Sequence, residues 1–153
     1  VKGYYPKFPK KEQQVCSPLI SFRRGLNLLV NKLHLKQTRI SSVCYSYDDA
    51  WKRILNIQPA DEKVMPGAFV DWDNTPRYKS RASIYQGVTP EKFERYLTQQ
   101  ICHARDDYKK DMIFMFAWNE WGEGGYLEPD EKYGYGMLEA VHNALDKTGE
   151  LEN

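Results

Sequence analysis

Short apolar runs along the chain are separated by polar stretches, and their lengths and spacings predict strands and helices in turn. Residues 63 to 70 and residues 112 to 118 are apolar runs typical of buried strands, and each ends abruptly in a polar, aromatic segment. Apolar residues recur at helical spacing over residues 49 to 56, 89 to 108 and 135 to 147. The sequence therefore predicts two strand-loop-helix units preceded by a further helix.

The predicted helices carry residues that commonly start and end helices. Asp48 is expected to cap the first of them, because its carboxylate can accept a bond from an unpaired backbone N–H. Thr89, Pro90 and Glu91 combine a hydroxyl cap, proline at the first helical position and an acid in the first turn. Gly149 is expected to close the last helix.

The first part of the chain gives weaker signals. Residues 1 to 16 combine prolines and lysines with little apolar periodicity, which predicts an irregular lead-in. Residues 17 to 35 have leucines at helical spacing and predict an amphipathic helix. Residues 40 to 45 could form a short strand.

The order of the elements predicts an α/β fold. Two successive strand-loop-helix units imply parallel strands joined by right-handed crossovers, so that both loops open on one rim. A complete (β/α)8 barrel needs about 250 residues, and this chain has 153. We therefore interpret residues 17 to 153 as the carboxyl-terminal part of a TIM-like barrel, or a truncated copy of one, behind the lead-in of residues 1 to 16.

Composition narrows the classes of function. The formal net charge of +1 gives no support for nucleic acid as a partner, which normally requires a basic face. The longest apolar run, residues 112 to 118, is far shorter than the roughly 20 residues of a membrane span. Three widely spaced cysteines make a reducing cytoplasm the simplest expectation of location.

Candidate chemistry follows the second predicted strand. Asn119, Glu120 and Glu123 come just past its end, between Trp118 and Trp121. The carboxyl ends of parallel strands are where reactive side chains converge on a ligand. Paired acids beside indoles suggest sugar chemistry, because a flat aromatic ring packs on the apolar face of a pyranose while the acids move protons. Asn119 could orient a glutamate, bind a hydroxyl or simply form a turn.

The two glutamates can share one site only if the chain turns between them. On a straight strand, residues three apart point to opposite faces, so a bend is required at Trp121 and Gly122. Neighbouring glycines make such a bend easy. Retaining glycosidases hold their carboxyls roughly 5 to 5.5 Å apart and inverting ones roughly 6.5 to 9.5 Å, and the sequence does not choose between them. We expect Trp118 to lie in the core and Trp121 to be the sugar-stacking ring.

A second polar and aromatic cluster follows the first predicted strand. Asp71, Trp72, Asp73 and Arg77 could line the sugar site from the neighbouring strand, or form a local salt-bridged loop. The aspartate pair could suggest a metal ligand, but neither histidine nor a third acid accompanies it, so we expect no metal and no cofactor. Tyr126 is expected to shape the rim of the site.

Three longer stretches resemble a known family. PGAFVDWDNTPRY at residues 66 to 78, TPEKFERYL at 89 to 97 and FAWNEWGEGGYLEPD at 116 to 130 resemble the WbsX-like proteins of polysaccharide biosynthesis clusters. Those proteins are regarded as glycosyltransferases and are similar to glycoside hydrolase family 99, the endo-α-mannosidases.

The resemblance implies roles for the two glutamates. It places the catalytic carboxylates on Glu120, as a base toward the sugar 2-hydroxyl, and on Glu123, as general acid and then general base. The implied reaction passes through a 1,2-anhydro intermediate with retention. The hydrolase motif, NEWHEG, has histidine where this chain has Gly122.

Three hypotheses of different classes follow. The first is a carbohydrate-active enzyme fragment, a glycosyltransferase or retaining glycosidase of polysaccharide or O-antigen metabolism, acting through Glu120 and Glu123. The second is a non-catalytic glycan-binding or scaffold remnant. The third is a truncated product that does not fold alone and associates with itself or with the missing amino-terminal half of the barrel.

Overall fold

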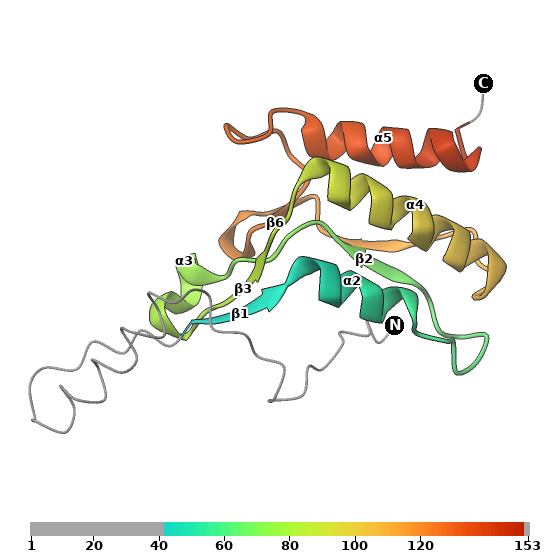
Figure 1. Ribbon diagram of the computed structural model, residues 1–153, viewed down its shortest axis with the longest axis horizontal. Helices are drawn as coiled ribbons and strands as arrows, with labels where there is room; N and C mark the ends of the chain where they lie inside the picture. The colour runs from blue at the N-terminus through green and yellow to red at the C-terminus, as the bar shows by residue number, and fades with distance from the viewer. Residues whose placement is uncertain (1–41, 152–153) are drawn as a thin grey trace, which may run out of the picture.

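The structure is a computed structural model that describes residues 42 to 151 (Figure 1). The predicted lead-in and the predicted helix over residues 17 to 35 lie outside these residues. In chain order the described elements are β1 (Val43–Ser46), α2 (Tyr47–Leu55), β2 (Gly67–Phe69), α3 (Thr75–Tyr78), η2 (Lys79–Arg81), β3 (Ser83–Gln86), α4 (Pro90–Asp106), β4 (Phe114–Phe116), β5 (Asn119–Glu120), η3 (Trp121–Glu123), β6 (Gly125–Tyr126) and α5 (Gly136–Thr148).

The strands form parallel pairs, as the order of elements predicts. β2 pairs with β4 in parallel, with Gly67 opposite Phe114, and α4 lies between them in sequence. β1 pairs in parallel with β3, and the short β5 and β6 pair antiparallel. Within the described residues these are three two-stranded sheets and no closed barrel. The fold class is therefore α/β with parallel strand pairs.

The helix α4 begins where its sequence predicts. The hydroxyl of Thr89 accepts a hydrogen bond from the backbone N–H of Lys92 at 3.3 Å, and Pro90 occupies the first turn. Its buried face carries Phe93 and Leu97, which pack in one cluster with residues of α5. Figure 1 shows α5 lying along α4, on the side away from the strands.

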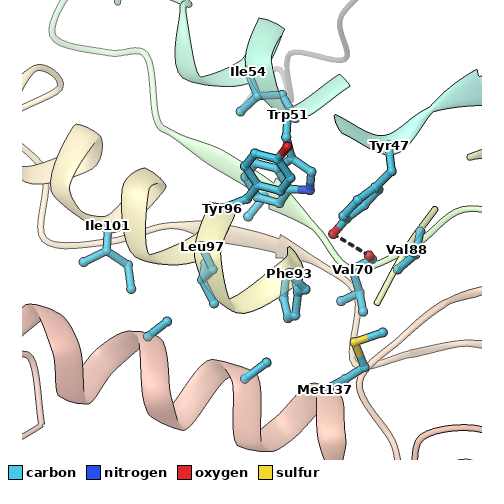
Figure 2. Packing of buried hydrophobic residues seen from close by; sticks show 13 residues of the cluster. Tyr47, Trp51, Ile54, Val70, Val88, Phe93, Tyr96, Leu97, Ile101 and Met137 are labelled. Carbon is cyan, nitrogen blue, oxygen red and sulfur yellow. Dashed lines mark hydrogen bonds between the residues drawn. The ribbon is translucent and has the colours of Figure 1, made fainter. Parts of the chain in front are cut away.

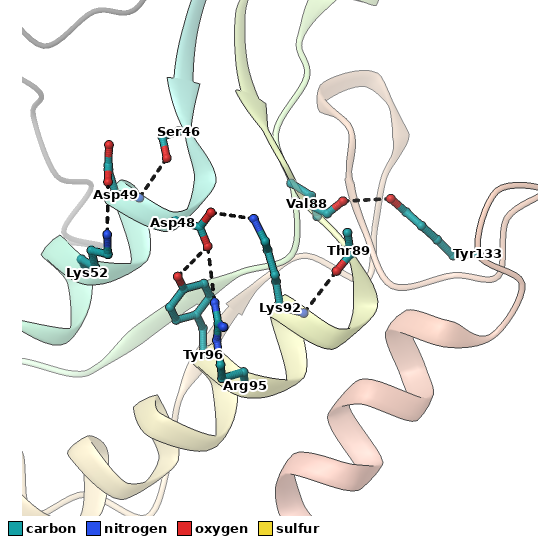
Figure 3. Close-up of polar contacts among 10 residues, drawn as sticks. All are labelled: Ser46, Asp48, Asp49, Lys52, Val88, Thr89, Lys92, Arg95, Tyr96 and Tyr133. Carbon is teal, nitrogen blue, oxygen red and sulfur yellow. Dashed lines mark hydrogen bonds and ion pairs between the residues drawn. The ribbon is translucent and has the colours of Figure 1, made fainter.

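The cap of α2 differs from the prediction. Ser46, not Asp48, caps this helix, with its hydroxyl accepting from the N–H of Asp49 at 3.2 Å. Asp48 lies in the first turn, and its carboxylate accepts bonds from Lys92 at 2.6 Å and Tyr96 at 2.6 Å on α4 (Figure 3). The reason is that a neighbouring serine satisfies the helix end, which leaves the carboxylate to join two helices.

An aromatic cluster forms the centre of the core (Figure 2). Trp51 is fully buried and lies between Phe69, at a ring distance of 5.5 Å, and Tyr96, at 5.6 Å. The hydroxyl of Tyr47 donates to the carbonyl of Val70 at 2.9 Å. This core fixes the carboxyl end of β2, from which the candidate site begins.

The strand β3 is not among the elements predicted from the pattern. It lies between Arg77 and Thr89, and the N–H of Tyr85 donates to the carbonyl of Trp72 at 2.9 Å. Ile84 and Tyr85, a β-branched residue and an aromatic one, are the local signal that could have indicated it. Its consequence is that the loop after β2 is held by a strand as well as by its own turns.

Candidate functional site

The loops that follow β2 and β4 meet, as the parallel arrangement predicts. The N–H of Asp73 donates to the carbonyl of Glu123 at 2.8 Å. A Cβ atom at Gly124 would lie 2.8 Å from the nitrogen of Asp73, and one at Gly125 would lie 2.5 Å from the ring of Phe116. Glycine at these two positions allows the backbone of Asp73 and the ring of Phe116 to approach the turn this closely.

The chain does turn between the two glutamates. Residues from β5 to β6 form a short hairpin around the 3-10 turn η3. The left-handed residue that closes this turn is Gly124, with φ of 68°, and its N–H donates to the carbonyl of Trp121 at 3.2 Å. The bend that we expected at Gly122 is thus made by the whole turn, with positive φ at Gly124.

One guanidinium connects both glutamates. Arg77 donates from Nη2 to Glu120 Oε1 at 2.5 Å and from Nη1 to Glu123 Oε1 at 3.3 Å. The side chain of Glu120 is 34% exposed and that of Glu123 is 17% exposed. The two carboxylates therefore face one common group instead of opposite directions, and both are partly exposed.

Gly122 lies against the same guanidinium. A Cβ atom at this position would be 2.7 Å from Nε and 3.0 Å from Nη2 of Arg77. The hydrolase motif that this segment resembles has histidine here. In this chain the space next to the backbone is occupied by the guanidinium of Arg77, which comes from the short helix α3.

Trp121 forms a fixed aromatic surface beside the acids. Its ring stacks on Tyr126 at 3.8 Å and 14°, and its Nε1 donates to Glu128 at 2.5 Å. The hydroxyl of Tyr126 donates to Asp130 at 2.9 Å, and burial together with this bond raises the pKa of Tyr126 to about 12. Trp121 is 47% exposed, so its orientation is set while part of its surface stays open.

Trp118 is not in the core. Its side chain is 55% exposed, so the expectation that it is buried is wrong. The reason is that β4 ends at Phe116, two residues earlier than the apolar run suggests. Asn119, the first residue of β5, is also exposed and lies opposite Tyr126.

Asp71 is the acid with the most altered titration in this region. Burial raises the pKa of Asp71 to about 6, and the N–H of Trp72 and the charge of Lys132 only partly oppose this effect. Its Oδ1 accepts from the N–H of Trp72 at 2.6 Å. Lys132 was not singled out from the sequence, because it lies alone in a polar loop.

The side chains of the remaining residues of the second cluster make contacts within their own loop and with β3 and β4. Asp73 accepts from the N–H of Thr75 at 2.9 Å, and Trp72 Nε1 donates to Ser83 at 3.0 Å. Trp72 also packs on Phe116, with ring centroids 5.5 Å apart. Of this cluster, Arg77 makes the direct side-chain contact with the glutamates.

A large groove lies at the other end of β4. It has a volume of about 820 Å³ and is lined by apolar side chains of α4, β4 and α5, by Met112 and Ile113, and by the charged residues Arg105, Lys109, Lys110, Asp111 and Glu150. The lining includes none of the predicted site residues.

Across residues 42 to 151 no group of three potential metal-ligating side chains is present, and no helix there is long and apolar enough to cross a membrane.

Paired acids thus lie after the carboxyl end of one parallel strand of an α/β protein, beside a partly exposed indole, and comparison with known proteins gives the family. Residues 5 to 141 match the family described as glycosyltransferase WbsX, so the chain belongs to that family.

Two curated relatives, both called uncharacterized protein WxcX, come from two strains of Xanthomonas campestris pv. campestris. Each is 36% identical to this chain over 93 residues, which is 60% of the chain and 13% of the relative. The chain thus spans a small part of the length of these relatives. No solved structure matches the chain.

Proposed function

We propose that this chain carries the paired-acid part of an enzyme that breaks or forms glycosidic bonds, with Glu120 and Glu123 as the acting carboxylates. The observation that carries the proposal is the contact of both carboxylates with the guanidinium of Arg77, after the carboxyl end of β4. The partly exposed ring of Trp121 beside them supports a sugar ligand. Membership in the WbsX family supports a carbohydrate substrate.

In this proposal the two acids have different tasks. Glu120, the more exposed, takes the proton of the sugar 2-hydroxyl, whose oxygen attacks the anomeric carbon to give a 1,2-anhydro intermediate. Glu123 protonates the departing glycosidic oxygen and then removes a proton from the acceptor. The acceptor oxygen opens the anhydro ring at the anomeric carbon, while Glu120 returns its proton to the sugar 2-oxygen. The assignment of the two tasks follows the order of the glutamates in the hydrolase motif that this segment resembles, in which the first acts as base and the second as acid. A sugar acceptor makes the enzyme a glycosyltransferase and water makes it a retaining glycosidase.

We further propose that the described elements belong to the carboxyl-terminal part of a (β/α)8 barrel. The parallel pairing of β2 with β4 and the meeting of their loops support this. Met112 and Phe114 are 54% and 49% exposed, as expected where a neighbouring strand or partner would cover β4. The missing part of a longer chain or a second copy would supply that cover. A cytoplasmic setting and polysaccharide or O-antigen metabolism complete the proposal.

The central experiment replaces one acid at a time. Glu123→Gln should abolish turnover of mannose-containing oligosaccharides while calorimetry still shows their binding. The amide keeps the size and shape of the carboxyl group but cannot act as a general acid or base. Glu139→Gln, at an exposed position of α5, is the matched control and should leave turnover unchanged. Undiminished turnover in Glu123→Gln would exclude its acid role.

A non-catalytic glycan-binding role is the second candidate. The observation that favours it is the rigid stack of Trp121 on Tyr126, which would hold a sugar ring without any chemistry. In that case the oligosaccharides bind, Trp121→Ala weakens binding, and neither hydrolysis nor transfer is detected with any acceptor.

A further inference from the structure

We propose that Arg77 is a positioning residue that holds Glu120 and Glu123 in one site, and that Gly122 is required because the guanidinium occupies the space of a side chain there. This inference rests on the proposed function for its consequence in catalysis. Its geometric part concerns the folded chain alone and can be tested without any substrate.

The contacts of Arg77 fix two acceptors with one planar group. Nη2 reaches Glu120 at 2.5 Å and Nη1 reaches Glu123 at 3.3 Å. Because the nitrogens of a guanidinium have a fixed separation, two bonds from it set the relative position of both carboxylates. A lysine ammonium is a point charge on a flexible stem and does not impose that geometry.

The backbone conformation of Gly122 does not by itself require glycine. Its φ lies outside the left-handed region, unlike that of Gly124, which is 68°. A residue with a side chain could therefore adopt this backbone. What excludes one is the contact of 2.7 Å that its Cβ would make with Nε of Arg77.

The partner in this contact is the mobile end of a long side chain, which can move. Arg77 is half exposed, so a Cβ at position 122 would push the guanidinium away instead of breaking the fold. The glutamates would then lose their common partner. We therefore expect Gly122→Ala to reproduce the loss of Arg77 and to add nothing once Arg77 is gone.

The experiment is a double-mutant cycle on Arg77→Ala and Gly122→Ala in the protein as it exists. Thermal unfolding is the readout that needs no activity. Each single variant should lower the unfolding midpoint by about 2 to 4 °C, the range expected when partly exposed ion pairs are lost. The double variant should be no lower than Arg77→Ala alone. Equal losses for Gly122→Ala in both backgrounds would overturn the inference.

The catalytic readout separates this inference from the proposed function. Turnover should fall about 100-fold in Arg77→Ala and in Gly122→Ala, because displaced acids no longer align with the sugar. The pH dependence of turnover should change in both variants, which a merely structural role would not produce. Arg77→Lys should recover less than a tenth of the lost rate, since it restores charge without the planar geometry.

Arg105 supplies the matched control. It also pairs with two acids, Asp106 at 3.2 Å and Glu150 at 3.3 Å, and has nearly the same exposure as Arg77. Arg105→Ala should change neither the turnover nor its pH dependence. If Glu123→Gln keeps full turnover while the unfolding midpoints remain coupled, the proposed enzyme mechanism fails and the positioning by Arg77 stands.

Discussion

The backbone N–H of Asp73 donates a hydrogen bond to the carbonyl of Glu123 at 2.8 Å. This bond joins the loop after β2 to the turn that carries the second glutamate. The two segments can come this close because Gly124 has no side chain facing Asp73.

Substituting Gly124 should therefore disturb the junction of the two loops. Gly124→Ala introduces a Cβ 2.8 Å from the nitrogen of Asp73 at a residue with φ of 68°. We expect a loss of about 2 to 4 kcal/mol in the free energy of unfolding, measured with denaturant, from backbone strain and the broken approach. Gly134→Ala is the control, because its φ is 57° and no atom lies within 4 Å. Similar losses in both variants would mean that the close approach to Asp73 has no energetic weight.

Asp71 should make stability fall as pH rises through mildly acidic values. Burial raises its folded pKa from 3.8 to about 6, so between about pH 4 and pH 6 the folded protein binds more protons than the unfolded chain. The free energy of unfolding then decreases with rising pH, by at most about 3 kcal/mol in all, and levels off above that range. Asp71→Asn should flatten this slope in denaturation series from pH 4 to pH 7. Asp146→Asn, at an exposed position of α5, should leave the slope as it is.

The bonds of Asp48 should contribute to the contact between α2 and α4. Burial opposes its ionisation, but bonds from Lys92 and Tyr96 hold the pKa of Asp48 below its usual value. Asp48→Asn should therefore cost about 1 kcal/mol at pH 7, and the cost should shrink below about pH 4 as the native carboxyl takes up its proton. Asp49→Asn in the same turn removes only an exposed pair with Lys52 at 3.6 Å. A loss in that control as large as in Asp48→Asn would argue against a specific bridge between the helices.

Truncation of Trp51 should destabilise the protein strongly, whereas truncation of Trp118 should have almost no effect on stability. Trp51 is fully buried between two aromatic rings, whereas Trp118 is 55% exposed. Trp51→Ala should cost about 3 to 5 kcal/mol of unfolding free energy, because it leaves a cavity in the core. Trp118→Ala should change stability by less than about 0.5 kcal/mol. Chemical denaturation of both variants decides the point, and a large cost at Trp118 would show that its exposed ring supports the fold.

The sequence predicted the features that are determined by residues close together in the chain, such as the ends of helices. The long helix expected over residues 89 to 108 is α4, Pro90–Asp106, because a hydroxyl cap and a proline fix its start and the apolar spacing fixes its buried face. Gly149, with φ of 73°, ends α5 as expected. The parallel pairing of β2 and β4 also followed from the order of the elements.

The errors arise where a competing local group decides the outcome. Ser46 took the cap expected from Asp48, and Trp118 fell beyond the end of β4. The sequence suggested that Arg77 and the glutamates share a rim, but not that one guanidinium contacts both acids. A contact of that kind depends on side-chain placement across two loops, which spacing along the chain does not encode.

The ion pairs of Arg77 span 43 and 46 residues of the chain, and α4 lies between their ends. Closing so long a segment has an entropic cost that two exposed ion pairs are too weak to offset. The packing of α4 against the core must therefore offset that cost. The acid pair would thus assemble late in folding, and a substitution on the buried face of α4, far from any sugar, could abolish it without touching a single group that contacts the ligand.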